Sequence, residues 1–260
     1  MNEKNVTREN GGLAIRPDQT AADLVIRYPH LRLALERLGL DYCCGGHRTL
    51  AEAARRAGLE LDTVLSELRA VAAPSADTGE SIDWAAADLT RLADHILTTH
   101  HVFTRSQIAR IQALSDSVSA AHRDRHGALL DRLAEGFGRL REELEAHLMK
   151  EEQILFPAIK AIDAYCAGNG PRPVVHCGSV AHPIRQMEYE HDGAGEALAE
   201  MRRLTDGYRL PADACPTFAA LYEALETLER DLHQHIHLEN NILFPASVRQ
   251  EASITPRAQA

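Results

Sequence analysis

The sequence predicts an all-α protein in which a small domain of short helices precedes an antiparallel four-helix bundle. Two observations carry this prediction. Four long segments repeat apolar residues at the three- and four-residue steps of a helix, and no segment of similar length alternates as a strand does. Ahead of them lie four short segments of the same period, each ended by a Pro, a Gly or a polar linker. Long helices with short connections pack as antiparallel neighbours.

Breaks in composition divide the chain into five parts. The first residues are polar and rich in Asn and Gly, and a later stretch, APSADTGES, has the Pro, Gly, Ser and Asp content of a linker. The long helical segments cover residues 83–119, 122–165, 179–205 and 216–249. We therefore expect a disordered arm (1–16), a domain of short helices (17–73), a linker (74–82), the four-helix bundle (83–250) and a flexible tail (251–260).

Charge and composition exclude two classes of partner. With a net charge of −10 and no run of Lys or Arg, the chain lacks the basic face that nucleic-acid phosphates require. No stretch of about 18 apolar residues is present to span a bilayer, and the first residues are polar. Five cysteines, two of them adjacent, do not suit a disulfide framework. We expect a cytoplasmic protein with reduced thiols and with no nucleic-acid or membrane partner.

An internal repeat places polar residues where a bundle helix needs leucine. The stretches HLMKEEQILFP (147–157) and HIHLENNILFP (235–245) are offset by 88 residues. In both helices the inward stripe of three- and four-residue steps runs through a His and a Glu before it returns to Ile. The stripes are Leu133, Phe137, Leu140, Leu144, His147, Glu151 and Ile154, and Leu221, Leu225, Leu228, Leu232, His235, Glu239 and Ile242.

The other two long segments each contribute a histidine to the same interior. His191 lies on the stripe of the third segment, between Met187 and Ala194. In the first segment both His100 and His101 fall on or near the apolar face, and the helical period alone does not choose between them. The remaining histidines are expected at the surface or outside the ligand set: His30, His47, His95, His122, His126, His176, His182, His233 and His237.

Four histidines and two glutamates in a leucine-lined core indicate a two-metal site. A buried carboxylate costs several kcal/mol unless a cation compensates it. Each ion would take two His, and the two Glu would bridge between the ions. Imidazole with carboxylate favours iron, manganese or zinc, the absence of Cys at these positions speaks against a structural zinc site, and two-metal carboxylate sites in helical bundles are most often di-iron.

The motif DYCCGG (41–46) lies between two expected short helices. Adjacent cysteines cannot form the CxxC clamp of a zinc site or of a thioredoxin. One interpretation is a turn with two partly buried thiols, in which Gly45 and Gly46 adopt positive φ. The other is a reactive thiol pair, Cys43 and Cys44, whose pKa is lowered by the dipole of the helix that opens at Thr49.

Taken in order, DYCCGG, HLMKEEQILFP, MEYEHDGAG and HIHLENNILFP resemble the bacterial iron-sulfur cluster repair di-iron proteins, the family known as RIC, YtfE or ScdA. The resemblance covers roughly residues 20–249 and implies an ScdA_N-like domain followed by a hemerythrin-like bundle. It implies two non-heme iron ions, oxo- or hydroxo-bridged. The family pattern DHI-x4-H selects His101, and the implied ligands are His101, His147, Glu151, His191, His235 and Glu239. It carries the paired family cysteines, as catalytic residues, onto Cys43 and Cys44.

The same resemblance implies the repair of iron-sulfur clusters damaged by nitrosative or oxidative stress, with iron donated to damaged iron-sulfur proteins as clients. Two alternatives use the same site: a nitric oxide reductase or peroxidase, and a hemerythrin-like sensor of O2 or nitric oxide. The thiol motif favours repair, because a simple carrier needs no thiol module. The assembly state, with a homodimer among the options, stays open at this level.

Overall fold

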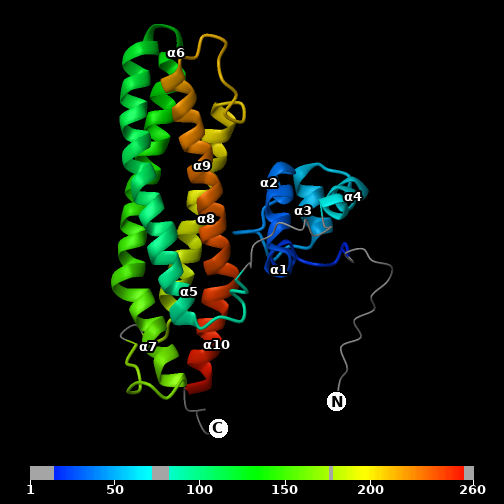
Figure 1. The fold of residues 1–260 in the computed structure, drawn as a ribbon, viewed down its shortest axis with the longest axis vertical. Helices are drawn as coiled ribbons and strands as arrows, with labels where there is room; N and C mark the ends of the chain where they lie inside the picture. The colour runs from blue at the N-terminus through cyan, green and yellow to red at the C-terminus, as the bar shows by residue number, and fades with distance from the viewer. Residues whose placement is uncertain (1–14, 72–81, 176–177, 255–260) are drawn as a thin grey trace. The chain divides into compact units, whose positions relative to one another are not determined.

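The computed structural model describes residues 15–71, 82–175 and 178–254. Within these ranges every regular element is helical, and one isolated β-bridge joins Thr20 to Thr49, which confirms the expected all-α fold (Figure 1). In the same ranges, no helix has the length and apolarity needed to cross a lipid bilayer. Outside the described residues lie most of the expected arm and linker, the His176–Cys177 pair and the end of the expected tail.

The chain divides into two compact units between Ala86 and Ala87. The first unit contains the expected short helices, α1 (Ala21–Arg27), the 3-10 helix η1 (Pro29–Leu31), α2 (Arg32–Arg37), α3 (Leu50–Ala57) and α4 (Leu61–Val71). The helix α3 begins at a capping box between Thr49 and Glu52 and ends at Gly58, whose φ of 70° suits a glycine. The helices enclose a fully buried apolar core that includes Leu31, Leu35, Leu50, Val64 and Leu68.

The second unit is the bundle. Its elements are α5 (Leu89–His95), η2 (Ile96–His101), α6 (Val102–Lys150), η3 (Glu151–Leu155), α7 (Phe156–Cys166), α8 (Ala181–Leu204), α9 (Pro216–Leu238), η4 (Glu239–Leu243) and α10 (Phe244–Ile254). Here η2, η3 and η4 are short π-helical segments within longer helices. The apolar stripes of α6, α8 and α9 pack together as the core, which includes Phe137, Leu140, Leu198, Leu225 and Leu228.

The helix α6 contains a reversal. A straight helix of its 49 residues would be about 70 Å long. Yet the side chains of His101 and Glu152, just beyond its two ends, lie 2.8 Å apart, and Gln112 contacts Arg141 at 3.1 Å. Both pairs are centred on His126–Gly127, so the chain turns back there, at the end of the bundle where Figure 1 shows α6 reversing. The break expected between residues 119 and 122 was therefore placed several residues too early.

The ends of the expected segments also shift. The first bundle helix begins at Leu89 rather than at residue 83. At this start of the helix, the Asp163 carboxylate accepts a hydrogen bond from the Thr90 N–H. Residues 251–254, expected in the flexible tail, belong to α10, and Glu251 accepts a hydrogen bond from the Val180 N–H. At the other end, Ile15 was expected in the disordered arm but is buried, and its carbonyl accepts a hydrogen bond from Arg69.

The three π-helical segments adjust the phase of the bundle at the buried His and Glu residues. His101 ends η2, Glu151 begins η3 and Glu239 begins η4. A π turn inserts one residue into the helical repeat and is common at functional sites. As a result Leu155, four residues after Glu151, is buried, whereas Ile154, which the regular stripe placed inside, is 55% exposed. The expectation for Ile154 was wrong because it assumed an uninterrupted α-helical period.

Candidate metal centre

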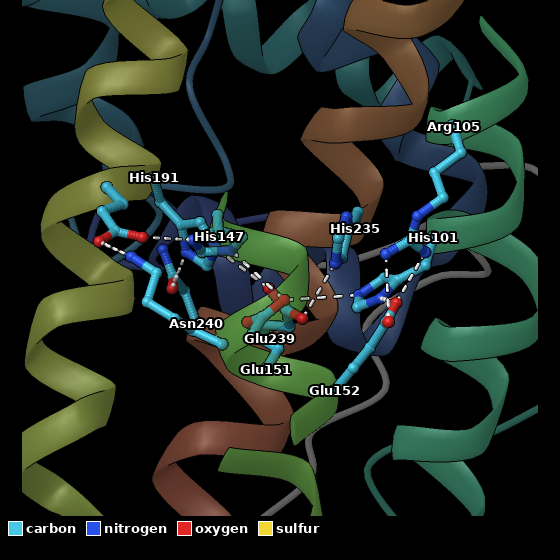
Figure 2. A network of polar contacts seen from close by, with 11 residues as sticks. His101, Arg105, His147, Glu151, Glu152, His191, His235, Glu239 and Asn240 are labelled. Carbon is cyan, nitrogen blue, oxygen red and sulfur yellow. Dashed lines mark hydrogen bonds and ion pairs between the residues drawn. The ribbon is translucent and has the colours of Figure 1, made fainter. Parts of the chain in front are cut away.

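The six residues predicted as metal ligands converge in the core of the bundle. Their donor atoms form two groups, and within each group all four atoms lie within 4.8 Å of one another. Figure 2 shows the two glutamates in the middle, with one pair of histidines on each side. Each glutamate belongs to both groups. The groups are His101, Glu151, His235 and Glu239, and His147, Glu151, His191 and Glu239.

The distances describe two adjacent metal pockets that share the carboxylates of Glu151 and Glu239. Glu239 directs Oε1 to His235 Nε2 at 2.9 Å and Oε2 to His191 Nε2 at 3.1 Å, so its two oxygens serve different pockets. The Oε2 atom of Glu151 lies 3.4 Å from His101 Nε2 and 3.3 Å from His147 Nε2. Two ligand atoms, each about 2.1 Å from one ion and at right angles, would be about 3 Å apart. The spacing therefore fits first-row metal ions.

The polar atoms in these pockets fit a cation for a second reason. His101, Glu151 and Glu239 are at most 1% exposed. Both carboxylate oxygens of Glu151 and the Nε2 atom of His101 have no hydrogen-bond partner among the residues that the structure describes. The Nε2 atoms of His147 and His191 face each other at 3.1 Å, which is favourable only with a proton or a metal ion between them. Two bound metal ions would satisfy all of these atoms.

Outer side chains orient three of the four imidazole rings. Nδ1 of His101 donates to Glu152 at 2.8 Å, and Nδ1 of His147 donates to Glu190 at 2.8 Å. Nδ1 of His191 lies 2.8 Å from the Asn240 side-chain oxygen. Because a carboxylate can only accept, the proton sits on Nδ1 and Nε2 is left to bind a metal. Hydrogen bonds of this kind fix ring orientation and raise the basicity of a ligand.

These outer partners were missed in the sequence, although their positions follow a simple rule. Glu152 directly follows Glu151, Asn240 directly follows Glu239, and Glu190 directly precedes His191. Each neighbour of one inward residue therefore reaches a histidine on a different helix. Arg105 and Lys150 complete this outer layer by pairing with Glu152 and with Glu190.

His100 and His101 lie at different places in the bundle. His101 is the member of the inner cluster. His100 is also buried, but its Nδ1 atom contacts Asp231 at 3.0 Å and its ring stacks on His235 with 5.5 Å between centroids. His237, expected at the surface or outside the ligand set, is buried as well, at 4% exposure. Burial alone therefore does not identify the inner histidines; the shared geometry with the two glutamates does.

The cluster stabilises its own charges in the metal-free state. Burial and the neighbouring Glu239 raise the pKa of Glu151, but the contacts with His147 and His101 outweigh them, so the carboxyl pKa lies below its usual value. Burial lowers the pKa of His147, and Glu151 then raises it to about 10. The hydrogen bond from His147 lowers the pKa of Glu190 to about 2. Two of the inner histidines, His101 and His147, therefore have a raised pKa, because they face the buried glutamates.

A cavity of about 640 Å³ reaches this cluster from the surface between α6, α8 and α9. Its lining includes three of the inner histidines, His147, His191 and His235, together with Lys150 and Glu190. The cavity is large enough for water and for small ligands or ions to approach the inner histidines.

The cysteine motif lies in the first unit, in the loop between α2 and α3. Gly45 and Gly46 do not adopt the positive φ that we expected. Gly46 is required instead by close packing, because a Cβ there would lie 2.4 Å from the Tyr42 carbonyl oxygen. A Cβ on Gly45 would meet only the ends of the Arg48 and Asp41 side chains. Asp41 accepts hydrogen bonds from the N–H groups of Cys43 and Gly45, which closes the loop.

The lowered thiol pKa of the second interpretation is not found at Cys43. The Sγ atoms of Cys43 and Cys44 lie 3.9 Å apart. Cys43 is 6% exposed, and its contact with Cys44 together with burial raises the pKa of its thiol well above the usual value. Of the two interpretations, the turn with partly buried thiols fits Cys43 better, because this thiol faces another sulfur and the protein interior.

Comparison with known proteins matches both units. A hemerythrin HHE cation binding domain matches residues 92–247, and ScdA_N, described as a domain of unknown function, matches residues 17–72. The iron-sulfur cluster repair proteins YtfE of Cronobacter sakazakii and of an Enterobacter species are each 38% identical over 90% of this chain and 98% of their own length. The YtfE protein of Escherichia coli O81 is 36% identical over the same shares. The chain therefore belongs to the YtfE-like iron-sulfur cluster repair proteins, with an ScdA_N domain followed by a hemerythrin domain.

Proposed function

We propose that this protein holds two iron ions in the bundle and donates iron to damaged iron-sulfur proteins. The observation that carries the proposal is the pair of four-residue ligand groups that share Glu151 and Glu239. The names of the relatives support the repair of iron-sulfur clusters as the task.

Each ion has its own pair of histidines in this proposal. His101 and His235 bind one ion, His147 and His191 bind the other, and both glutamates bridge. The imidazole and carboxylate donors suit iron, and ferrous iron held by neutral imidazoles at an accessible site is exchangeable. When bound, the two irons would supply the iron that is transferred and redox chemistry with nitric oxide or O2.

The paired thiols serve the transfer. Thiolates are good ligands for ferrous iron, and the loop holds the sulfur atoms of Cys43 and Cys44 3.9 Å apart. Because the Cys43 thiol is buried and its pKa is raised, this role requires the loop to open and the thiol to lose its proton as iron binds. We assign them a role in receiving iron or contacting the client, in a reducing compartment such as the cytoplasm, where damaged iron-sulfur proteins are found and thiols stay reduced.

The site is tested by metal analysis with Mössbauer spectroscopy on protein prepared without air. Two irons per chain are expected in the parent protein. Glu151→Ala removes a ligand that both irons share, so both are expected to bind more weakly. Fewer than two irons in the parent, or two tightly held irons in the variant, would overturn the assignment. Lys160→Ala, on an exposed pair with Asp94, serves as the matched control.

Repair is tested by mixing the iron-loaded protein with a dehydratase whose cluster has been damaged by nitric oxide, under reducing conditions. Donation predicts that dehydratase activity returns faster than with the same amount of free ferrous iron. If the two rates are equal, iron donation is wrong, and turnover of nitric oxide by the loaded protein would then favour the reductase alternative. Cys43→Ser with Cys44→Ser is expected to slow repair while leaving two irons in the bundle.

A further inference from the structure

A second cluster of metal-binding side chains lies at the end of the bundle where α6 reverses. Donor atoms of His122, His126 and Asp213 lie within 4.8 Å of one another. The two histidines are separated by one helical turn, and the aspartate comes from the connection between α8 and α9. His122 is 21 residues beyond His101, about 30 Å along a helix, so this cluster is distinct from the central one.

The three side chains are held in place by their surroundings. His126 Nε2 lies 2.9 Å from one Asp213 oxygen, and Arg125 donates to the other at 3.0 Å. The buried ring of Phe218 packs edge-on against both histidines, with centroid distances of 5.3 Å and 5.7 Å. Such packing limits the rotamers of both rings, which reduces the entropy lost when they bind a common ion.

A fourth donor lies next to these three residues. Cys215 is two residues beyond Asp213, directly before α9, and its thiol interacts with the His122 ring, although its sulfur is not among the donor atoms that lie within 4.8 Å of one another. Thiolates at helix N-termini beside histidine are good metal ligands. Cys215 is a free cysteine and is partly exposed, so its sulfur is accessible to an ion from solvent.

We propose that His122, His126, Asp213 and Cys215 form a mononuclear site for a divalent ion of the zinc class. Two neutral imidazoles, one carboxylate and one thiolate supply four donors of the types that zinc takes, and their two negative charges balance Zn²⁺. The bound ion would connect the turn of α6 to the α8–α9 connection and thereby hold the end of the bundle together. The contacts among the protein side chains alone are two ion pairs, in which the Asp213 carboxylate lies between Arg125 and His126.

The test measures zinc binding to the full-length, iron-loaded protein that carries Cys43→Ser and Cys44→Ser, so that the other thiol pair does not contribute. One zinc ion per chain beyond the irons is expected after gel filtration, together with a rise in the thermal midpoint that grows with zinc concentration. His126→Ala is expected to weaken this binding at least tenfold and to abolish the thermal shift. His182→Ala and Cys166→Ser, both at exposed positions, serve as controls and should bind zinc like the parent.

Asp213→Asn gives a second variant, since this loop side chain can be changed without opening the core. It keeps the size of the side chain and removes its charge, so zinc binding should again weaken while the iron content stays the same. Co²⁺ in place of zinc should give the visible bands of a four-coordinate ion and a thiolate charge-transfer band that Cys215→Ser removes. The proposal is overturned if the parent binds no additional zinc, if His126→Ala and Asp213→Asn bind it as the parent does, or if cobalt shows no thiolate band.

Discussion

Glu152 and Asn240 occupy equivalent positions in the two halves of the bundle, 88 residues apart, and each contacts Nδ1 of a histidine on another helix at 2.8 Å. One partner is a carboxylate and the other a neutral amide. A charged acceptor makes an imidazole more electron-rich than a neutral acceptor does. His101 and His191 are therefore inequivalent donors in an otherwise repeated site, and the two bound metals should differ.

Glu152→Ala is expected to weaken one metal and spare the other. Loss of an outer hydrogen bond of this kind typically reduces metal affinity 10–100-fold, because the ring is no longer held in position. The metal bound by His101 and His235 should be removed by a lower concentration of chelator than in the parent. Asn240→Ala is the matched variant and should weaken the metal bound by His147 and His191 instead. Equal losses from both metals in either variant would contradict this assignment.

His101→Ala and His100→Ala should differ in metal content. His101 belongs to the inner group, so its removal is expected to leave about one tightly held metal per chain. His100 contacts Asp231 and stacks on His235, so its removal should leave two metals and alter mainly the environment of His235. Metal content measured after exchange into chelator-containing buffer separates the two. A His100→Ala protein with one metal and a His101→Ala protein with two would reverse the roles.

The inner cluster was predictable because a helix has one period and each inner residue lies on an interior stripe. His147, Glu151, His235 and Glu239 interrupt runs of leucine in two copies of one motif, so their phase alone placed them together. The same argument put both His100 and His101 near the core and did not separate them. The family resemblance selected His101, and the structure agrees, because only His101 shares the inner group with the two glutamates.

Other features depend on contacts between helices, which a single-helix period does not encode. The burial of Leu155 in place of Ile154 follows from the π turn at η3, and the reversal near His126 follows from the pairing of the two arms of α6. The roles of Glu190 and Asn240 require knowing which helices are neighbours. Their sequence signal is a polar residue directly beside His191 and directly beside Glu239.

Metal binding should release protons, with a definite pH dependence. In the metal-free protein the pKa of His147 is about 10, above the value of about 6.5 for a free imidazole. The proton that His147 holds therefore stabilises the metal-free fold fully below pH of about 6.5, and this contribution is lost as pH rises through about 10. A bound metal replaces that proton, so the metal-loaded protein should lack this dependence.

Two measurements check this. In urea unfolding, the free energy of unfolding of the metal-free protein should fall more between pH 8 and 10 than that of the loaded protein. The other titrating groups are the same in both forms, so their effects largely cancel. Metal added at pH 8 in weak buffer should release protons, and the affinity should increase with pH in this range. Parallel pH profiles for the two forms, with no proton release, would contradict the predicted charge on His147.

Two glycine substitutions should have opposite effects on stability. Gly46→Ala places a Cβ 2.4 Å from the Tyr42 carbonyl oxygen in the cysteine loop, and the resulting strain is expected to destabilise the first unit by about 1–3 kcal/mol. Gly138→Ala lies within α6 with nothing within 4 Å of its new Cβ, so the better helix propensity should stabilise the bundle by about 0.5–1 kcal/mol. Urea unfolding measures both, and a stabilised Gly46→Ala protein would contradict the close packing of the loop.

The cysteines should react with iodoacetamide in a definite order. The pKa of Cys215 is lowered to about 7, whereas burial and Cys44 raise the pKa of Cys43. Since the thiolate is the nucleophile, metal-free protein at neutral pH should be alkylated first at Cys215, then at the exposed Cys166, and last at Cys43. Mass spectrometry of peptides over time gives the order, and His122→Ala should slow Cys215 without changing Cys166. Early alkylation of Cys43 in the folded protein would mean that its loop opens readily, because a buried thiol with a raised pKa cannot react from the closed form.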